Sequence, residues 1–453
     1  MTDTLTSRDA MELNAKEVLG AEAVLMDDAV GMFDLTETPE LRQRRLREGR
    51  FKIYGLVAIA ISLAALALLV GSTFAKGVGV LSESQIGLEV TYPESLDPSG
   101  ERDPEALRLA SYRPVISDAL ARDLGESDDL ANRRKLVTLL SAGAGFDLGD
   151  RVAENPELVG TTETVWLSAS SDVDALLRGR VDRSVPEALR RISDADIARV
   201  ERLEARGQTR RAFNMPFFSN GDSREPEIAG VLGAFLGSLL TVAVCLALSF
   251  PIGVATAVYL EEFAPKNRFT DFIEVNINNL AAVPSIVYGL LGLYMFLGVF
   301  GLPRSTPLVG GMVLALMALP IIIIASRASL RSVPPSVRAA ALGLGASKVQ
   351  TTFHHVVPLA MPGMLTGTII AMARALGETA PLLMIGMVAF IVDLPGGVTD
   401  AATTMPVQIF LWFDNPERAF QERASAAIIV LLLLLVLMNL VAVLLRRKLE
   451  RRW

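Results

Sequence analysis

The stretch IAGVLGAFLGSLLTVAVCLALSFPIGVATAVYL, residues 228–260, contains no charged side chain over 33 consecutive positions. A helix of about 20 apolar residues is long enough to cross the hydrocarbon core of a bilayer. This stretch is therefore predicted to span a membrane. It is one of several such blocks, into which the 51% of hydrophobic residues in this 453-residue chain are gathered. That distribution indicates an integral membrane protein rather than a soluble protein with a large core.

Six apolar blocks of spanning length follow one another along the chain. The other five cover residues 53–75, 275–303, 305–326, 361–392 and 424–445. Only the block at 361–392 contains charged residues, Arg374 and Glu378. The predicted fold is therefore an all-α polytopic membrane protein with six transmembrane helices.

The distribution of basic residues predicts the orientation of these spans. One basic cluster precedes the first span and another follows the last, at Arg42, Arg44, Arg45, Arg47, Arg50 and Lys52, and at Arg446, Arg447, Lys448, Arg451 and Arg452. Because basic residues concentrate on the cytoplasmic side, both termini are predicted to be cytoplasmic in an inner (plasma) membrane. No early apolar region precedes position 53, so the first span is expected to act as an uncleaved signal anchor.

This topology divides the chain into five parts. A cytoplasmic tail (1–52) precedes the first helix (53–75), and a polar region of domain size (77–226) follows it outside the membrane. Pro, Gly and Asp punctuation and helical runs such as 184–206 predict a mixed α/β fold for this extracytoplasmic region. A five-helix transmembrane region (228–446) and a basic cytoplasmic tail (447–453) complete the chain.

Several classes of function are disfavoured by composition. Cys245 is the single cysteine and there are two histidines, which excludes a disulfide within the chain and argues against a metal site. No basic patch with interleaved aromatics indicates nucleic-acid binding. No nucleotide-binding motif or nucleophile triad is present, and Gly343–Lys348 lacks the spacing of a phosphate-binding loop. We therefore expect no cofactor and no ATPase site, and hence a protein that is not itself an enzyme.

The loop at 332–356, between the fourth and fifth spans, has a helical pattern. Pro334 and Pro335 suit the first turn of a helix, and the alanines that follow favour its continuation. Gly343 and Gly345 permit a sharp turn, after which Ser347 is a candidate N-cap. A short helix at the cytoplasmic face is suited to dock into a groove of a soluble partner. An ordinary connecting loop is the alternative.

This loop resembles the coupling-loop signature of ABC-importer permeases, which reads Glu-Ala-Ala, three residues, Gly, and a Pro about a dozen residues on. The glycine falls on Gly345 and the proline on Pro358. The other signature and loop positions are Arg338, Ala339, Ala340, Ala341, Ser347 and Lys348. Ala339 stands where the family usually has an acidic residue, and Arg338 or Ser336 are candidate substitutes. The resemblance implies the type I ABC-importer permease fold, with this loop seated in a cleft of a nucleotide-binding subunit.

Three further segments resemble the phosphate permeases of this class. They are 374–381 (RALGETAP), 251–262 and 279–289 (NLAAVPSIVYG). The resemblance covers roughly residues 228–453 and implies the subunit-A type, in a branch with an extra N-terminal region. It implies import of inorganic phosphate driven by ATP. The implied partners are a homologous permease subunit, a dimer of ATP-binding subunits, an extracytoplasmic phosphate-binding protein, the lipid bilayer and a phosphate-signalling regulator.

Arg374 is the leading candidate for a substrate contact. It lies 13 residues into the fifth block, or about 20 Å deep at 1.5 Å per residue, near the bilayer midplane. A charge there costs at least ~2.5–3.5 kcal/mol, so it must face a cavity or a partner. A guanidinium matches phosphate with paired donors, and Glu378, four residues on, can neutralise it in the empty state. The alternative is a structural pair that joins the fifth span to a neighbour.

Four other residues complete the predicted pathway: Thr379, Asn279, Ser285 and Arg327. For Asn279 hydrogen bonding between packed helices is the alternative. Arg327 lies at the inner end of the fourth span, and its alternative role is that of a basic anchor on the cytoplasmic side. Pro284 and Gly289 are candidate bend positions in the third span.

Two other functions fit the same residues. One is a permease for another oxyanion, such as sulfate or molybdate. The other is a membrane sensor, in which the region 77–226 reads a signal and the loop at 332–356 relays it to a regulator. Uptake of phosphate against sulfate tests the first alternative, and deletion of residues 77–226 tests the second.

Overall fold

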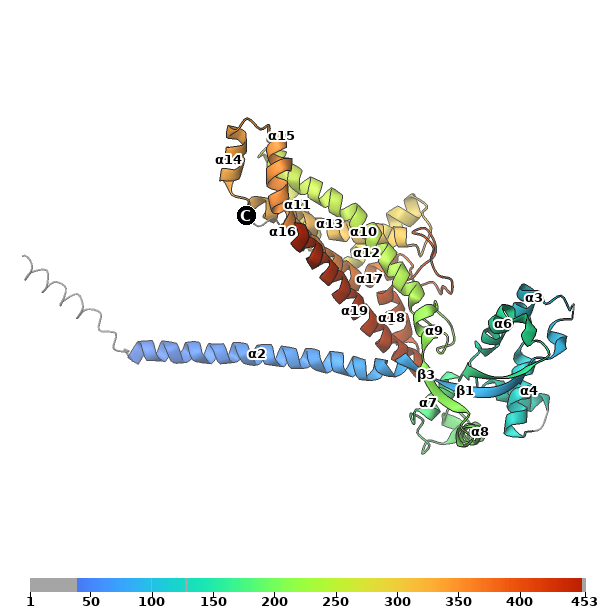
Figure 1. The fold of residues 1–453 in the computed structure, drawn as a ribbon. Coiled ribbons are helices and arrows are strands. Elements are labelled where there is room, and N and C mark those ends of the chain that lie inside the picture. Colours follow the sequence, from blue (N-terminus) through green and yellow to red (C-terminus); the bar gives the residue numbers. More distant parts are fainter. Residues whose placement is uncertain (1–38, 99, 127–128, 450–453) are drawn as a thin grey trace, which may run out of the picture. The chain divides into compact units, whose positions relative to one another are not determined.

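The computed structural model describes residues 39–98, 100–126 and 129–449 (Figure 1). Residues 1–38 of the predicted tail (1–52), together with Arg451 and Arg452 of the terminal basic cluster, lie outside them. The chain divides into two compact units, Met1–Gly71 and Ser72–Trp453.

Helix α2 (Pro39–Gly77) contains the first predicted span and begins well before it. Along its apolar window the side chains are exposed, among them Leu66 and Leu68. An apolar helix of this length with no buried face needs lipid or protein around it.

The polar region contains a three-stranded antiparallel sheet in the order β2-β1-β3. Its strands are β1 (Ser82–Thr91), β2 (Thr162–Ser168) and β3 (Thr209–Phe213). Ile86, Leu88 and Val90 alternate along β1 and are fully buried, because one face of a strand repeats every second residue. Leu88 pairs with Val165 and Ile86 with Thr209, so β1 is the central strand.

Helices cover this sheet and close its core. They are α3 (Pro104–Leu109), α4 (Arg113–Leu124), α5 (Leu130–Val137), α6 (Ala144–Glu154), α7 (Ser171–Leu177) and α8 (Asp194–Ala205). The polar region also contains α9 (Met215–Ser219) and the short turns η1 (Val78–Leu81), η2 (Glu94–Leu96), η3 (Pro156–Leu158) and η4 (Glu187–Leu189). This part of the chain therefore contains both helices and strands, and it has a hydrophobic core of its own.

The membrane region is built around α13 (Pro307–Arg331), which packs against α10 (Leu232–Val258) and α16 (Val357–Gly377). Glycines allow the close approach: a Cβ built on Gly311 would lie 2.5 Å from Val244. A π-helical turn, η5 (Tyr259–Phe263), continues α10, and α19 (Arg418–Leu449) packs against α16. Among the described residues, five helices are long and apolar enough to span, or six if one bent pair counts as a span.

The bent pair is the third predicted span, which is not a continuous helix over 275–303. Helix α11 (Arg268–Ala281) stops, and α12 (Ser285–Gly292) resumes at an angle of 101°, followed by the π-helical η6 (Leu293–Val299). Pro284 stands in the break as the residue before α12, where its fixed φ and missing N–H interrupt the hydrogen-bond ladder. The bend therefore lies at Pro284 and not at Gly289.

The fifth predicted span, 361–392, is wrong in extent. The helix begins earlier, as α15 (Lys348–Thr351) and the π-helical η7 (Thr352–Val356), and ends when α16 stops at Gly377. A short helix α17 (Ala380–Met384) follows, and the chain then has no regular helix until α18 (Met405–Asp414). The absence of charge over 379–392 predicted that the span continues through these residues, but the helix ends before them.

Within the second unit, the polar domain and the 332–356 loop lie at opposite ends of the helical bundle (Figure 1). The loop forms α14 (Pro335–Gly343), which contacts α15 and η7. At the other end, Phe217 on α9 packs with Trp412, Phe420 and Ala424, so the polar domain is anchored to the bundle by an apolar cluster.

Candidate translocation site and coupling helix

Arg374 and Glu378 form an ion pair where α16 ends. Arg374 lies in the last turn of α16 and Glu378 is its C-cap. The Arg374 Nε donates to Glu378 Oε1 at 3.3 Å, and the two side chains are 48% and 18% exposed. This is a long, single contact, and it leaves most of the guanidinium donors facing outward from the subunit.

The depth of Arg374 follows from the packing of α16 on α13. A Cβ on Gly363 would lie 2.3 Å from Ser329, and one on Gly367 would lie 2.2 Å from Ala325, so the two helices run antiparallel in register. Continuing that register places Arg374 opposite Ala318, near the middle of the 25-residue α13. Arg374 therefore lies at the end of a helix and yet near the middle of the membrane region.

The break in the third span lies beside this helix end. Helix α12 packs against α17, and a Cβ on Gly289 would lie 2.7 Å from the Cα of Pro381. The Tyr288 hydroxyl donates to the carbonyl oxygen of Leu280 at 2.8 Å and ties the two sides of the break together. Two interrupted helices are thus packed together next to a guanidinium.

Three predicted pathway residues flank these interruptions. Asn279 is exposed in the last turn of α11, and Ser285 is the half-buried first residue of α12. Thr379 is half-buried and immediately precedes α17. Since α12 packs on α17, the structure brings Ser285 and Thr379 to neighbouring interruptions together with Arg374 and Glu378.

Arg327 lies elsewhere, in an ion-pair network in the last two turns of α13. Its side chain is 11% exposed and contacts Glu274 at 2.8 Å and Glu261 at 3.4 Å. Arg331 reaches Glu261 at 3.0 Å and Glu274 at 3.7 Å. These four residues join α10, α11 and α13, so the structure does not bring Arg327 together with Arg374.

The loop at 332–356 contains the helix that the alanines and prolines predict. Gly345 follows α14 with φ +87°, a left-handed conformation that glycine adopts without strain. The predicted N-cap at Ser347 is confirmed: its hydroxyl accepts from the Gln350 N–H, and the Gln350 side chain accepts from the Ser347 N–H, as a capping box. Pro358 lies in the first turn of α16, half-buried.

The outward surface of α14 is apolar and small. Ala339 and Ala340 are exposed and Ala341 is buried. Leu342 is 51% exposed, and Leu344, just after the helix, is 89% exposed. Neighbouring exposed leucines at the end of a short helix and in the turn after it are typical of a surface that a partner covers.

Arg338 connects α14 to the rest of the subunit through an ion pair and two hydrogen bonds. Its Nη2 donates to Glu262 Oε1 at 2.7 Å, and it also donates to the carbonyl oxygens of Val333 (2.7 Å) and Leu330 (2.9 Å). Glu262 is only 9% exposed. Because Arg338 is turned inward, it does not replace the acidic residue missing at Ala339. Nearby, the Lys348 ammonium lies 5.4 Å from the centre of the Phe263 ring.

Comparison with known proteins gives two family matches. Residues 249–453 match the family described as "Binding-protein-dependent transport system inner membrane component". Residues 38–187 match a "Domain of unknown function (DUF3333)". The "Phosphate transport system permease protein PstA 1" of Mycobacterium tuberculosis (strain H37Rv) is 33% identical over 217 residues, which are 48% of this chain and 70% of that protein. The PstA protein of Haemophilus influenzae is 30% identical over 205 residues, 45% of this chain and 71% of that protein.

This chain belongs to the PstA family of phosphate transport system permeases. It is a multi-pass membrane permease with the type I ABC-importer fold, and its relatives are transport components. Among solved structures, an inward-facing MetNI methionine ABC transporter is similar over 48% of this chain and 95% of that one, with 17% identity and a TM-score of 0.37. A "Phosphate transport system permease protein PstC" of Haemophilus influenzae is 31% identical over 200 residues, so the chain also resembles a second permease type.

The permease contains structural partners that the sequence analysis did not single out. Glu261, Glu262 and Glu274 hold the inner arginines, and Tyr288 closes the α11–α12 break. Glu261 and Glu262 follow directly on an apolar block. A pair of acids at the end of a span, close to several arginines, was the signal available for them.

Proposed function

We propose that this permease forms one side of the translocation pathway for inorganic phosphate, with Arg374 as its mid-membrane anion contact. The observation that carries the proposal is the exposure of Arg374, which is 48% open on the surface of a membrane bundle at the level of Ala318. A charge facing lipid at that depth costs at least ~2.5–3.5 kcal/mol. The surface around Arg374 therefore faces water or another protein rather than acyl chains.

A homologous permease subunit of the PstC type supplies that other surface in this proposal. At the two helix interruptions Asn279 is exposed, and Ser285 and Thr379 are half-buried. Hydroxyl and amide groups at two helix interruptions offer neutral hydrogen-bond partners along an anion path. Glu378 competes with phosphate for Arg374, so that the anion is not held too tightly to leave.

Energy comes from a separate dimer of PstB-type ATP-binding subunits, which engages the exposed tip of α14. The apolar surface of Leu342 and Leu344 supports a docking role for this helix. A force on α14 reaches the bundle through Arg338 and Glu262 at the end of α10. From there the network of Glu261, Arg327 and Glu274 reaches α11, whose far end is the break beside Arg374.

The remaining features of the proposal concern topology. Both termini are cytoplasmic, six spans cross the inner membrane, and the domain at 77–226 lies outside, where a PstS-type phosphate-binding protein delivers the substrate. The position of α14 and the polar domain at opposite ends of the bundle supports this orientation (Figure 1). Arg327 acts in it as a member of the inner ion-pair network rather than as a pathway residue.

The test is phosphate uptake by Arg374→Ala in cells that lack the native permease, with sulfate uptake measured in parallel. We expect phosphate uptake to fall by about 100-fold or more, which corresponds to ~2.7 kcal/mol. Arg304→Ala is the matched control, because Arg304 is an exposed arginine in the turn before α13. Full phosphate uptake by Arg374→Ala at normal membrane levels would refute the pathway role, and ATP-driven sulfate uptake would refute the substrate.

A further inference from the structure

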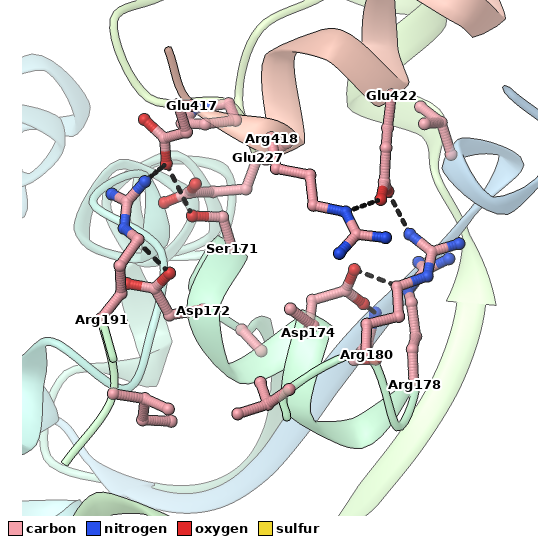
Figure 2. Close-up of a pocket in the computed structure, with 18 of the residues that line it drawn as sticks. Ser171, Asp172, Asp174, Arg178, Arg180, Arg191, Glu227, Glu417, Arg418 and Glu422 are labelled. Carbon is pink, nitrogen blue, oxygen red and sulfur yellow. Dashed lines mark hydrogen bonds and ion pairs between the residues drawn. The ribbon is translucent and has the colours of Figure 1, made fainter. Parts of the chain in front are cut away.

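A cavity of about 430 Å³ lies where the polar domain meets the outer end of α19 (Figure 2). One wall comes from the start of β1 and from α7 with the loop that follows it. The other comes from the segment before α10 and from the first turns of α19. This site is separate from the one around Arg374, which lies near the middle of the bundle.

Ion pairs close two sides of the cavity. Arg180 pairs with Glu422, which Arg418 also contacts at 3.5 Å. On the other side Arg191 bridges Asp172 at 3.3 Å and Glu417 at 3.0 Å (Figure 2). These pairs link the loop after α7 to α19. They also satisfy the charges that they contain, so they are not the part of the cavity that requires a ligand.

Arg423 is different, because its charge is not matched by a contacting carboxylate. Arg423 is only 7% exposed and lines the cavity. Nη1 donates to the carbonyl oxygen of Ala229 at 2.6 Å, and the guanidinium lies 5.9 Å from the centre of the Phe217 ring. Among the described residues no carboxylate lies within ion-pair distance of it. A buried guanidinium with unused donors is costly unless something else binds them.

The same cavity also contains a carboxyl group with an unused oxygen. Glu227 Oε2 is buried and has no hydrogen-bond partner among the described residues. Burial raises the pKa of Glu227 from its ordinary value, with Glu225 adding to the effect and Arg423 opposing it. Unused donors on Arg423 and an unused acceptor on Glu227 thus both line this one cavity.

We propose that this cavity is a second binding site for inorganic phosphate, outside the membrane, held by Arg423 and Glu227. Hydrogen phosphate accepts from a guanidinium through two of its oxygens, and its own P–OH donates to a carboxylate. Sulfate is fully ionised at neutral pH and has no proton to donate, so a carboxylate in the site discriminates against it.

The location of the site gives its occupant a structural consequence. Arg423 is on the first turns of α19, and Glu227 is on the segment that leads from the polar domain into α10. A phosphate bound to both would join two membrane helices to the base of the outer domain. The occupied site thereby couples external phosphate to the outer ends of α10 and α19, independently of any transport through Arg374.

The experiment measures equilibrium binding of radiolabelled phosphate to the full chain in lipid nanodiscs, in an Arg374→Ala background. That background removes the proposed pathway contact, so the binding that remains reports the outer site. We expect saturable phosphate binding, weakened about 10-fold by Arg423→Lys, which keeps the charge but loses the paired donors. We expect Glu227→Gln to bind phosphate more weakly and sulfate better, which reduces the preference for phosphate.

Arg304→Ala in the same background is the matched control and should bind phosphate normally. A helical circular dichroism spectrum and an unchanged elution volume establish that each variant is folded. Absence of saturable phosphate binding overturns the proposal. So does binding that neither Arg423→Lys nor Glu227→Gln alters. Either result leaves the uptake test of Arg374 unaffected, because that test depends on transport and not on this site.

Discussion

Arginines are held in opposite ways in the middle of the bundle and at the end next to α14, which we propose is the inner end. At the inner end, Arg338 makes a 2.7 Å contact with a nearly buried Glu262 and donates to two carbonyl oxygens. In the middle, Arg374 has one 3.3 Å contact with Glu378 and is about half exposed. A satisfied, buried pair fixes structure, whereas a loosely held charge at depth leaves its donors for something outside the subunit. The contact geometry, more than the residue type, distinguishes a structural arginine from one that is available to a ligand.

The largest effect on stability is expected at the inner end. Arg338→Ala leaves Glu262 buried without its partner, and loss of one member of a buried pair costs about 3–5 kcal/mol. Thermal unfolding in detergent should show a marked decrease for this variant. Replacing both members, Arg338→Met with Glu262→Met, should recover much of the loss, since the unpaired charge is gone. A single variant as stable as the parent chain would mean that the pair does not hold α14.

An ion-pair cluster in the polar domain extends the comparison to an aqueous setting. Hydrogen bonds from Arg199, then Arg202 and Asn132, lower the pKa of Glu126 from 4.5 to about 2, against the opposing effect of burial. A lowered native pKa adds stability above the unfolded pKa that is lost as the pH falls from 4.5 toward 2. Glu126→Gln should therefore unfold more easily by about 3 kcal/mol at pH 7.

The control for Glu126 is a carboxylate on the same domain that is exposed on a strand. Glu89→Gln is expected to change the free energy of unfolding by less than about 0.5 kcal/mol. The difference between Glu126→Gln and the parent chain should shrink steadily in unfolding curves taken from pH 5 down to pH 3. A difference that stays constant over that range would show that the carboxylate charge is not what stabilises the cluster.

A smaller and different effect is expected at the middle of the bundle. Arg374→Lys keeps the charge but replaces the planar fork of donors with a single ammonium. Phosphate uptake should fall by about 10-fold, or ~1.4 kcal/mol, while thermal unfolding stays within about 0.5 kcal/mol of the parent chain. A decrease in stability comparable to that of Arg338→Ala would make Arg374 a structural residue like the inner arginines.

The sequence was sufficient to predict that a charge-free block such as 305–326 forms a helix, but not where that helix ends. Helix α13 (Pro307–Arg331) begins near Ser305 and continues past Ser326, the limits of its uncharged block. The capping box at Ser347 and the turn at Gly345 follow from local chemistry, so they too were accessible. These features need only a few neighbouring residues to form.

Tertiary packing decided the parts that the sequence did not predict. Helix α16 stops at Gly377, inside the predicted span at 361–392 and directly before Glu378, and α17 then packs on α12 through Gly289. The partners Glu262 and Arg338 lie 76 positions apart in the chain, and Arg423 and Ala229 lie 194 apart. Hydrophobic periodicity carries no information about such pairings. The residues at the candidate site were predicted, but their setting at two helix interruptions was not.

The smallest expected effect is at the turn that ends α14, where backbone conformation alone is tested. Gly345 has φ +87° and nothing within 4 Å of a built Cβ, so Gly345→Ala adds strain of about 1 kcal/mol without a steric clash. Gly343→Ala is a matched control, because it also has open space but lies at the end of α14, where alanine favours helix. We expect Gly345→Ala to reduce ATP-driven phosphate uptake two- to fivefold and Gly343→Ala to leave it unchanged. Equal losses in both variants would place the effect in the outward surface of α14, and the inner arginines would then be supporting a contact surface rather than a turn of fixed shape.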